Sequence, residues 1–309
     1  MFHKALATSL LVSVLLNCAS CASIPYQRLD RTSLTRSTPT TPPGEPQFER
    51  GDPNTVLDAI GWVVGVPSKI ILWDRRLDNH RVGTNTEAVL TSYLEGNGLS
   101  DVKVRINQYA PLREFRRLVR NKGVSWGWRY SIGVLSWLYQ TILPGRIFGG
   151  DSYNPYTDTI SLYSDAPTVA LHEGGHAKDF AGKTMKGTYA FSYILPVFSL
   201  YAEARASNDA VSYLYAHGSA DEEKEAYRLL YPAMGTYVGG MFGGGALSPL
   251  SYVAVIPGHI VGRSKAAHVD EERAWRPPAD PLTKQAANQT EPPAGVSGEP
   301  ADGSTGTQP

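Results

Sequence analysis

The chain has 309 residues, and its 29 basic and 29 acidic side chains give a formal net charge of zero. This balance argues against a nucleic-acid-binding protein, because such proteins carry basic patches and a net positive charge. Hydrophobic residues make up 42% of the chain, which excludes a wholly disordered protein, while 30 glycines and 22 prolines predict long segments without regular structure.

The first 21 residues have the pattern of an export signal. Lys4 precedes an apolar run over residues 5–16, and small residues follow it. The run is too short for a membrane span, which needs about 20 apolar residues. The segment also resembles a bacterial lipoprotein signal, in which a cysteine is lipidated after cleavage. Cys21 fits that pattern better than Cys18, and the resemblance implies an outer-membrane lipoprotein facing the periplasm. Simple cleavage after a small residue is the alternative.

Two further segments have the composition of disorder. Residues 22–53 are polar and proline-rich and predict a disordered tether, and residues 275–309 predict a disordered tail rich in proline and glycine. Residues 54–274 remain as one domain of ordinary size. Its signals are mostly helical with a small β element, so we expect a mainly α fold of the α+β class.

Several elements are predicted in the first half of this domain. Residues 56–66 form an apolar segment that ends at Pro67. Thr84 and Glu87 have the spacing of a capping box, which predicts a helix through Leu94. Apolar and polar residues alternate over 102–106, as in a strand buried on one face only. Pro111 then begins a helix whose arginines form either a solvated face or a contact with an anionic membrane.

Three stretches carry no charge: residues 130–145, 187–202 and 229–262. The first two are short for a span, so we expect buried core helices or shallow interfacial insertions. The third is rich in glycine and long enough to form a helical hairpin turning at Pro249. Closely spaced glycines allow helices to pack tightly in lipid or in a protein core, so the sequence leaves open whether residues 229–262 enter the membrane.

Residues 159–163 alternate like a strand, and a helix follows from Pro167. That helix contains the sequence His172-Glu173-Gly174-Gly175-His176. Residues four apart lie on one helix face, so both imidazoles can reach a single ion. This HExxH pattern predicts a zinc site in which the two histidines bind metal and Glu173 is the general base. The two glycines predict a surface that substrate or another helix approaches closely.

Catalytic zinc takes a third protein ligand and leaves one position open. The only cysteines are Cys18 and Cys21, so a carboxylate or another histidine must provide it. Glu203 is the best candidate, because it is the only acid between Asp179 and Asp209 and follows an uncharged stretch in which an unpaired carboxylate would be unstable. An ion pair with Arg205 or Lys178 is the alternative role for Glu203, and His217 is an alternative ligand.

These motifs resemble the gluzincin metallopeptidases, and the apolar helices beside them resemble the membrane-bound CAAX prenyl protease and HtpX family. The resemblance implies a zincin-like fold with zinc on His172, His176 and Glu203. It covers residues 157–209, and Ser207 stands where that family has an aspartate supporting a ligand histidine. Asp179, on the same helical stripe as the two histidines, could replace this support, or it could be a surface acid.

In zincins a strand before the metal-binding helix forms the rim along which a peptide lies, and residues 159–163 could be such a strand or an ordinary core strand. The sequence does not single out an oxyanion-stabilising residue among Tyr201, His217, Tyr237 and His259.

We therefore expect a zinc-dependent endopeptidase of the bacterial envelope, acting on peptide or protein substrates. A non-catalytic lipoprotein scaffold with a structural zinc site and a zinc amidohydrolase are the alternatives. A purely structural site has no need of Glu173 beside the metal, and this residue therefore favours hydrolysis.

Overall fold

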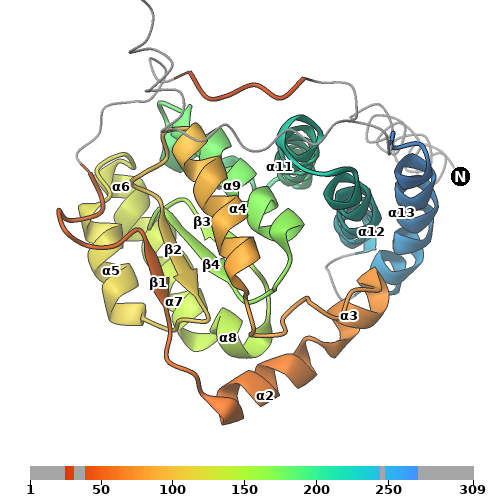
Figure 1. Ribbon diagram of the computed structural model, residues 1–309. Helices are drawn as coiled ribbons and strands as arrows, with labels where there is room; N and C mark the ends of the chain where they lie inside the picture. Colours follow the sequence, from red (N-terminus) through yellow and green to blue (C-terminus); the bar gives the residue numbers. More distant parts are fainter. Residues whose placement is uncertain (1–24, 31–38, 244–247, 271–309) are drawn as a thin grey trace, which may run out of the picture.

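The computed structural model describes residues 25–30, 39–243 and 248–270 of the chain (Figure 1). The export signal predicted over residues 1–21, with its lipidation site at Cys21, lies outside these residues. The tail predicted over residues 275–309 also lies outside them.

One four-stranded sheet lies at the centre of the fold, with strand order β1-β2-β4-β3. Strands β1 (Phe48–Arg50), β2 (Lys103–Ile106) and β4 (Thr159–Leu162) are parallel, and β3 (Ser152–Asn154) pairs with β4 in the antiparallel sense. Helices form most of the remaining structure, so the mainly α fold with a small β element is confirmed.

The helices follow one another along the chain in this order: α2 (Thr55–Val64), α3 (Val66–Leu72), α4 (Thr84–Gly96), α5 (Pro111–Arg120), α6 (Trp126–Trp128), the π-helical turn η2 (Arg129–Gly133), α7 (Val134–Ile142), α8 (Gly145–Phe148), α9 (Pro167–Ala181), α10 (Lys186–Ser192), α11 (Pro196–His217), α12 (Ala220–Gly243) and α13 (Pro249–Ala267).

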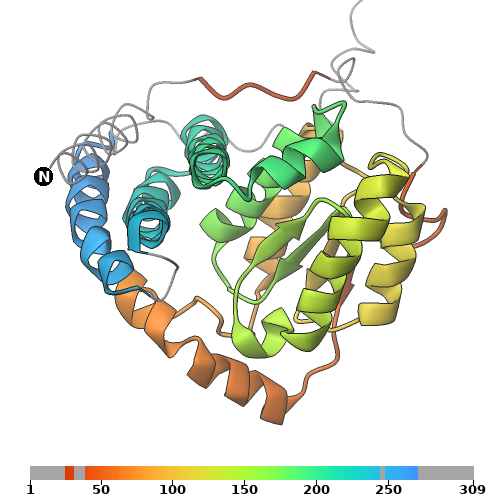
Figure 2. The same cartoon turned by 180° about the vertical axis from the view of Figure 1, so that it is seen from behind.

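The main core lies between one face of the sheet and helices α4 and α9. Val104 of β2 and Ile160 of β4 are buried there against Leu90 of α4 and Leu171 of α9. Helices α5 and α7 lie on the other side of the sheet, as Figures 1 and 2 show. Helix α11 packs on α9, α12 on α11, and α13 on α12, so the helices beyond α9 form successive layers.

Strand β2 is buried on both faces, which corrects the prediction of a half-buried strand. Lys103 and Arg105 are 0% and 1% exposed. Glu49 of β1 lies 2.7 Å from each of them, and Arg105 also pairs with Glu114 of α5. Buried cations need such partners. These pairs place residues 48–50 in the sheet, whereas the sequence predicted a disordered tether there.

The start of α4 differs from the predicted capping box. Gly83 is the N-cap, and Thr84 is already inside the helix. Asp165 takes over the capping role, because its carboxylate accepts hydrogen bonds from the Gly83 amide at 2.8 Å and from the Thr86 hydroxyl at 2.7 Å. This contact ties the start of α4 to the residues that precede α9.

Neither of the two shorter uncharged stretches forms a buried core helix. Leu135 and Ile142 of α7 are exposed, as are Ile194 and Val197 around the start of α11. The other prediction for these stretches, insertion at a membrane interface, stays a prediction.

Residues 229–262 belong to a closely packed helical hairpin, and α13 begins at Pro249 as predicted. A Cβ atom on Gly235 would lie 2.4 Å from the Ala254 carbonyl oxygen, and one on Gly239 would lie 2.4 Å from that of Leu250. The glycines therefore allow the two backbones to touch. Within the described ranges no single helix is long and apolar enough to cross a bilayer, although α2 and α3 together, bent by 46°, pass that test of length and composition.

Candidate metal centre

Helix α9 places His172 and His176 beside each other. Pro167 occupies its first turn, where the fixed φ of proline suits a helix start, and the helix continues without a break to Ala181. The two histidines are one turn apart, and their Nε2 atoms are 3.2 Å apart. Both side chains are buried. The predicted pairing of two imidazoles on one helix face is therefore present.

Helix α11 brings Glu203 to the same point. Its Oε2 lies 3.1 Å from Nε2 of His172, and its Oε1 lies 3.5 Å from Nε2 of His176. One ligand atom from each residue falls within 4.8 Å of the other two. Two imidazoles and one carboxylate therefore converge on a point where they could hold a metal ion.

The glycines of the motif allow neighbouring helices to reach α9. A Cβ on Gly175 would lie 3.0 Å from the backbone of Ala206 in α11, and one on Gly174 would lie 2.8 Å from the ring of Tyr93 in α4. The close approach that the sequence predicted is thus made by two helices. Ala206, which meets Gly175, is three residues after Glu203 on α11. This contact therefore positions the Glu203 carboxylate against the histidines.

Electrostatic coupling between the three side chains is strong. Burial opposes ionisation of Glu203, but hydrogen bonds from His172 and His176 outweigh it and hold the pKa of Glu203 well below its usual value. Burial likewise disfavours the charged form of His176, yet the bond to Glu203 raises its pKa. The centre therefore stabilises one carboxylate with positive charge close to it, the arrangement that a cation would also satisfy.

Glu173 lies beside this cluster without being part of it. Its side chain is buried, and burial raises its pKa against the opposing effect of the two histidines. The backbone amide of Tyr153, in strand β3, lies near this carboxylate and favours its charged form. A carboxylate with a raised pKa next to a metal-binding group is suited to accept a proton near neutral pH.

The two residues predicted to support the ligands have different surroundings. The Ser207 hydroxyl lies 3.2 Å from Nδ1 of His172, so it engages the ring nitrogen that faces away from Glu203. Asp179 is bonded instead by Tyr189 and paired with Lys183 and Arg205. The sequence named both positions, but only Ser207 makes a hydrogen bond to a ligand histidine.

Asp209 has its partners outside the cluster. Its carboxylate pairs with Lys178 of α9 at 2.6 Å and accepts a hydrogen bond from the Tyr93 hydroxyl of α4. This acid therefore joins α11 to α9 and α4 and fixes the register in which Glu203 meets the histidines.

Tyr237 of α12 is the one predicted oxyanion candidate that the structure joins to the cluster. Its hydroxyl lies near Glu203, whose negative charge raises the pKa of Tyr237 well above its usual value. The residue is 45% exposed, so its ring borders solvent while its hydroxyl faces the carboxylate.

The other three candidates have partners elsewhere. Arg205 donates a hydrogen bond to the Tyr201 hydroxyl, His217 packs on the ring of Tyr26, and His259 bonds to the Ile71 carbonyl. His217 therefore also lies away from the place of the third ligand. The sequence allows any of these four aromatic side chains as the oxyanion-stabilising residue. Only the packing of α12 distinguishes Tyr237 from the other three.

Residues 159–163 contain the ordinary core strand that was one of the two alternatives from the sequence, and the strand that borders the site is β3. Strand β4 lies inside the sheet between β2 and β3, and β3 forms the edge. The contact from the Tyr153 amide to Glu173 brings this edge against the cluster. The sequence could not predict this contact of the Tyr153 amide, because it is made by the backbone and does not depend on the side chain.

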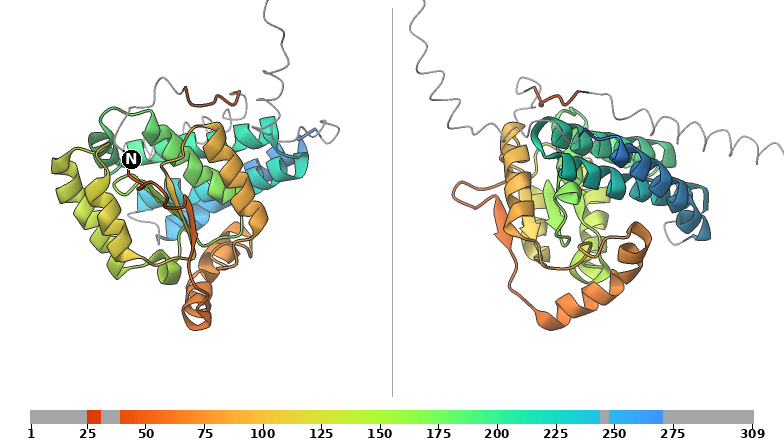
Figure 3. Two further views of the ribbon diagram at one scale, coloured as in Figure 1. Left: turned by 60° about the vertical axis from the view of Figure 1, so that its left-hand side comes forward. Right: turned by 45° about the vertical axis from the view of Figure 1, so that its right-hand side comes forward.

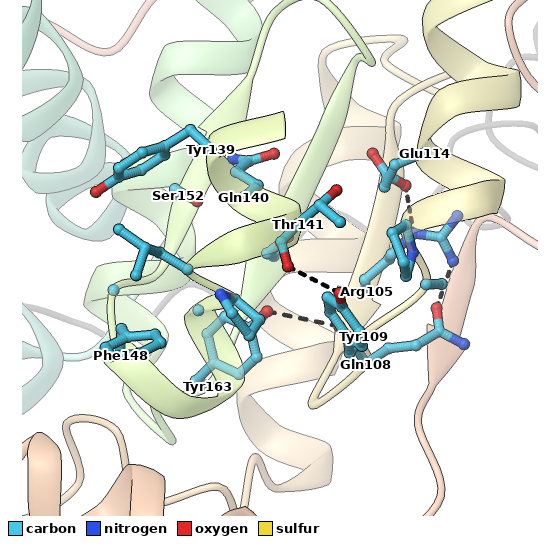
Figure 4. A pocket seen from close by; sticks show the side chains of 18 of the residues that line it. Arg105, Gln108, Tyr109, Glu114, Tyr139, Gln140, Thr141, Phe148, Ser152 and Tyr163 are labelled. Atoms are coloured by element: carbon cyan, nitrogen blue, oxygen red, sulfur yellow. Dashed lines mark hydrogen bonds and ion pairs between the residues drawn. The ribbon is translucent and has the colours of Figure 1, made fainter. Parts of the chain in front are cut away.

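A cavity of about 470 Å³ on another part of the molecule is lined by side chains of α5, α7 and the sheet (Figure 4). None of the metal-centre residues lines it. Arg105 reaches this cavity; Glu49, Glu114 and Gln108 accept hydrogen bonds from its Nε and Nη1, and its Nη2 has no partner among the described residues.

Comparison with known proteins finds no similar protein. No protein-family model, no curated protein and no solved structure matches the chain.

Proposed function

We propose that this chain is a zinc-dependent endopeptidase of the cell envelope, with His172, His176 and Glu203 as the metal ligands. One observation carries the proposal: two helices place these three side chains at a common point, with Glu173 buried directly beside them. Three protein ligands with an additional carboxylate nearby are typical of hydrolytic zinc sites.

The chemistry of the donors supports zinc, because imidazole nitrogens and a carboxylate oxygen are the usual protein ligands of catalytic zinc. The two imidazole Nε2 atoms are 3.2 Å apart, and the two Glu203 oxygens lie 3.1 Å from His172 and 3.5 Å from His176. Ser207 engages Nδ1 of His172, which leaves Nε2 for the ion, and such outer hydrogen bonds are typical of ligand histidines.

The residues then have separate roles in peptide hydrolysis. Zinc supplies Lewis acidity that polarises a peptide carbonyl and activates water. Glu173 accepts the proton of the attacking water and delivers it to the leaving amine, a transfer favoured by its raised pKa. Tyr237, whose hydroxyl already faces the cluster, donates a hydrogen bond to the oxyanion that develops on the substrate.

We propose that the substrate is an extended peptide bound along strand β3. This strand is the sheet edge nearest Glu173, and edge strands bind peptides through main-chain hydrogen bonds with little demand on sequence. The predicted lipid anchor at Cys21 would keep the enzyme at the outer membrane, on its periplasmic side.

The decisive experiment combines metal analysis with a cleavage assay on the full chain. The purified protein should contain about one zinc per chain and cleave casein or an unfolded membrane protein, and a chelator should abolish cleavage reversibly. His172→Ala should lose the metal and the activity together. Zinc content unchanged in that variant would contradict the ligand assignment.

Glu173→Gln tests catalysis separately from binding. It should keep the zinc but lower kcat about 10²–10⁴-fold, the usual contribution of a general base. Glu95→Gln, an exposed acid on α4, is the matched control and should behave as wild type. Bound zinc without hydrolysis in the wild-type protein would favour the scaffold with a structural zinc site, and cleavage of small amides alone would favour an amidohydrolase.

A further inference from the structure

Helices α2 and α3 form an arm that projects from the body of the protein. Figure 3, in its right-hand view, shows both helices extending away from the sheet. Their apolar side chains face outward: Val56, Val63 and Ile70 are 68%, 62% and 66% exposed. We call residues 55–73, which comprise these two helices and Trp73, the apolar arm.

No charged side chain faces outward from the apolar arm. It contains only two charged residues, Asp58 and Lys69. Asp58 pairs with Arg146 at 2.8 Å, and Lys69 is buried, where its ammonium donates to the carbonyl oxygens of Trp62 and Asp78. A surface helix in water normally turns a polar face to the solvent, and this arm does the opposite.

We infer that the apolar arm docks into the interface of a lipid bilayer. The interaction does not depend on the proposed peptidase activity. An apolar helical segment that buries its exposed side at the boundary of headgroups and acyl chains removes this surface from water.

The arm lies in the interface and does not cross the bilayer. The two helices have 10 and 7 residues, and with Gly65 between them they would span at most about 27 Å if straight, less than the roughly 30 Å of a hydrocarbon core. They are bent by 46°. Both ends also return to the protein, because α2 packs on α8 and α3 contacts α12 and α13.

Two tryptophans of the arm have the setting expected at a membrane interface. Trp73 stacks on His259 with ring centres 4.4 Å apart, and the guanidinium of Arg263 lies 4.3 Å from its ring. The Lys69 ammonium lies 5.2 Å from the ring of Trp62. Tryptophan is enriched at the headgroup level of a bilayer, where one side of the ring meets an apolar environment and the other is wet.

Helix α13 extends the apolar surface beyond the arm. Val253, Ile256 and Ile260 are all exposed, and their spacing of three and four residues places them on one stripe. Figures 1 and 2 show α2, α3 and α13 following one another along one rim of the molecule. A protein partner is usually held by polar and charged contacts as well as apolar ones, and neither charged residue of the arm turns outward, which favours lipid over a second protein.

A single environment-sensitive probe tests the docking directly. In the full chain, Cys18→Ser and Cys21→Ser remove both cysteines, so Val63→Cys can be labelled alone with a nitrobenzoxadiazole fluorophore. Adding vesicles of phosphatidylethanolamine and phosphatidylglycerol should shift its emission to the blue, and nitroxide lipids labelled near the headgroup should quench it. The same label on Glu95→Cys, an exposed position on α4, should not respond.

A pair of charge substitutions provides the second measurement. Ile60→Glu with Val63→Glu should lower the vesicle-bound fraction in flotation about tenfold or more, because each substitution removes an apolar side chain from the lipid and adds a charge. Leu112→Glu, at an exposed apolar position on α5, is the control and should bind as wild type. Circular dichroism confirms that each variant is folded.

Three results would overturn the inference. The label at position 63 could keep its aqueous emission when vesicles are added. Its emission could shift in buffer alone and increasingly with protein concentration, which would assign the surface to a second copy of the chain. The arm variants could also bind vesicles as tightly as Leu112→Glu, which would assign membrane binding to another part of the protein.

Discussion

At the scale of single residues, the chemistry of the centre depends on what each side chain contacts besides its neighbours in sequence. His172, Glu173 and His176 lie within five positions on α9. They differ because Glu203 lies beside the two histidines, while the Tyr153 amide lies near Glu173. In the proposed mechanism this division makes the histidines the metal ligands and Glu173 the group that transfers a proton.

Replacing Tyr237 with phenylalanine should affect turnover more than binding. Tyr237→Phe removes one hydroxyl from beside Glu203, and loss of one oxyanion donor lowers kcat about 10²–10³-fold. KM and zinc content should change little. Tyr201→Phe is the control, because that hydroxyl contacts Arg205. Equal losses in both variants would refute the assignment, and steady-state kinetics with metal analysis decides the question.

Replacing Ser207 with alanine should weaken metal binding. The variant Ser207→Ala loses the hydroxyl 3.2 Å from Nδ1 of His172, and loss of such an outer contact typically costs about 10–100-fold in metal affinity. Competition with a fluorescent zinc chelator measures the change. Ser207→Thr keeps a hydroxyl and should restore most of the affinity. An alanine variant with unchanged affinity would show that this contact does not orient the ring.

At the scale of elements, the centre depends on the distance between α9 and α11. Gly175 sits where the two helices touch, and a Cβ there would meet the backbone of Ala206. Two helix backbones packed this tightly can accommodate an added Cβ atom only by moving apart, and close-packed protein interiors transmit such shifts. The separation of these helices therefore controls whether Glu203 reaches the histidines.

Gly175→Ala should lower stability and metal affinity together. Overpacking at such a contact costs about 1–3 kcal/mol, partly offset by the better helix propensity of alanine. Gly96→Ala on α4 is the matched control, since nothing lies within 4 Å of a Cβ at that position. Denaturant unfolding and zinc titration of both variants test the prediction, and equal stability of the two would contradict it.

At the scale of the whole molecule, the residues before the predicted domain complete the sheet. Glu49 of β1 pairs with Lys103 and Arg105 on β2 and with Arg113 on α5. One carboxylate therefore balances two buried cations and joins the N-terminal segment to the body of the protein. Burial opposes its ionisation, but the hydrogen bond and charge of Lys103, with those of Arg105, outweigh it and lower its pKa from 4.5 to about 2.

Glu49→Gln should destabilise the fold by about 3 kcal/mol near neutral pH, because it removes the carboxylate that the buried Lys103 and Arg105 share. A lowered carboxyl pKa contributes stability that is present above the unfolded value of 4.5 and is lost as the pH falls toward about 2. The difference between wild type and variant should therefore shrink over that range. Urea unfolding at several pH values measures it, and a difference independent of pH would refute the role of the charge. Glu95→Gln is the control.

The sequence by itself determined the local parts of this protein. Residues four apart on a helix must share a face, so His172 and His176 could be paired and Glu173 singled out without any tertiary information. Proline at a helix start and alternation along a strand located α9 and β4 for the same local reason. Glu203 was predicted because an isolated carboxylate in an apolar stretch needs a partner.

Only the tertiary structure decided what meets across the fold. The sequence offers Tyr237 and Tyr201 equally as oxyanion-stabilising residues. Only the packing of α12 brings Tyr237 close to Glu203. Alternation predicted that Lys103 would face water, whereas Glu49, 54 residues away, allows it to be buried. An apolar pattern cannot distinguish a buried helix from an exposed one such as α2. These features arise from non-local contacts, whose geometry no short segment specifies.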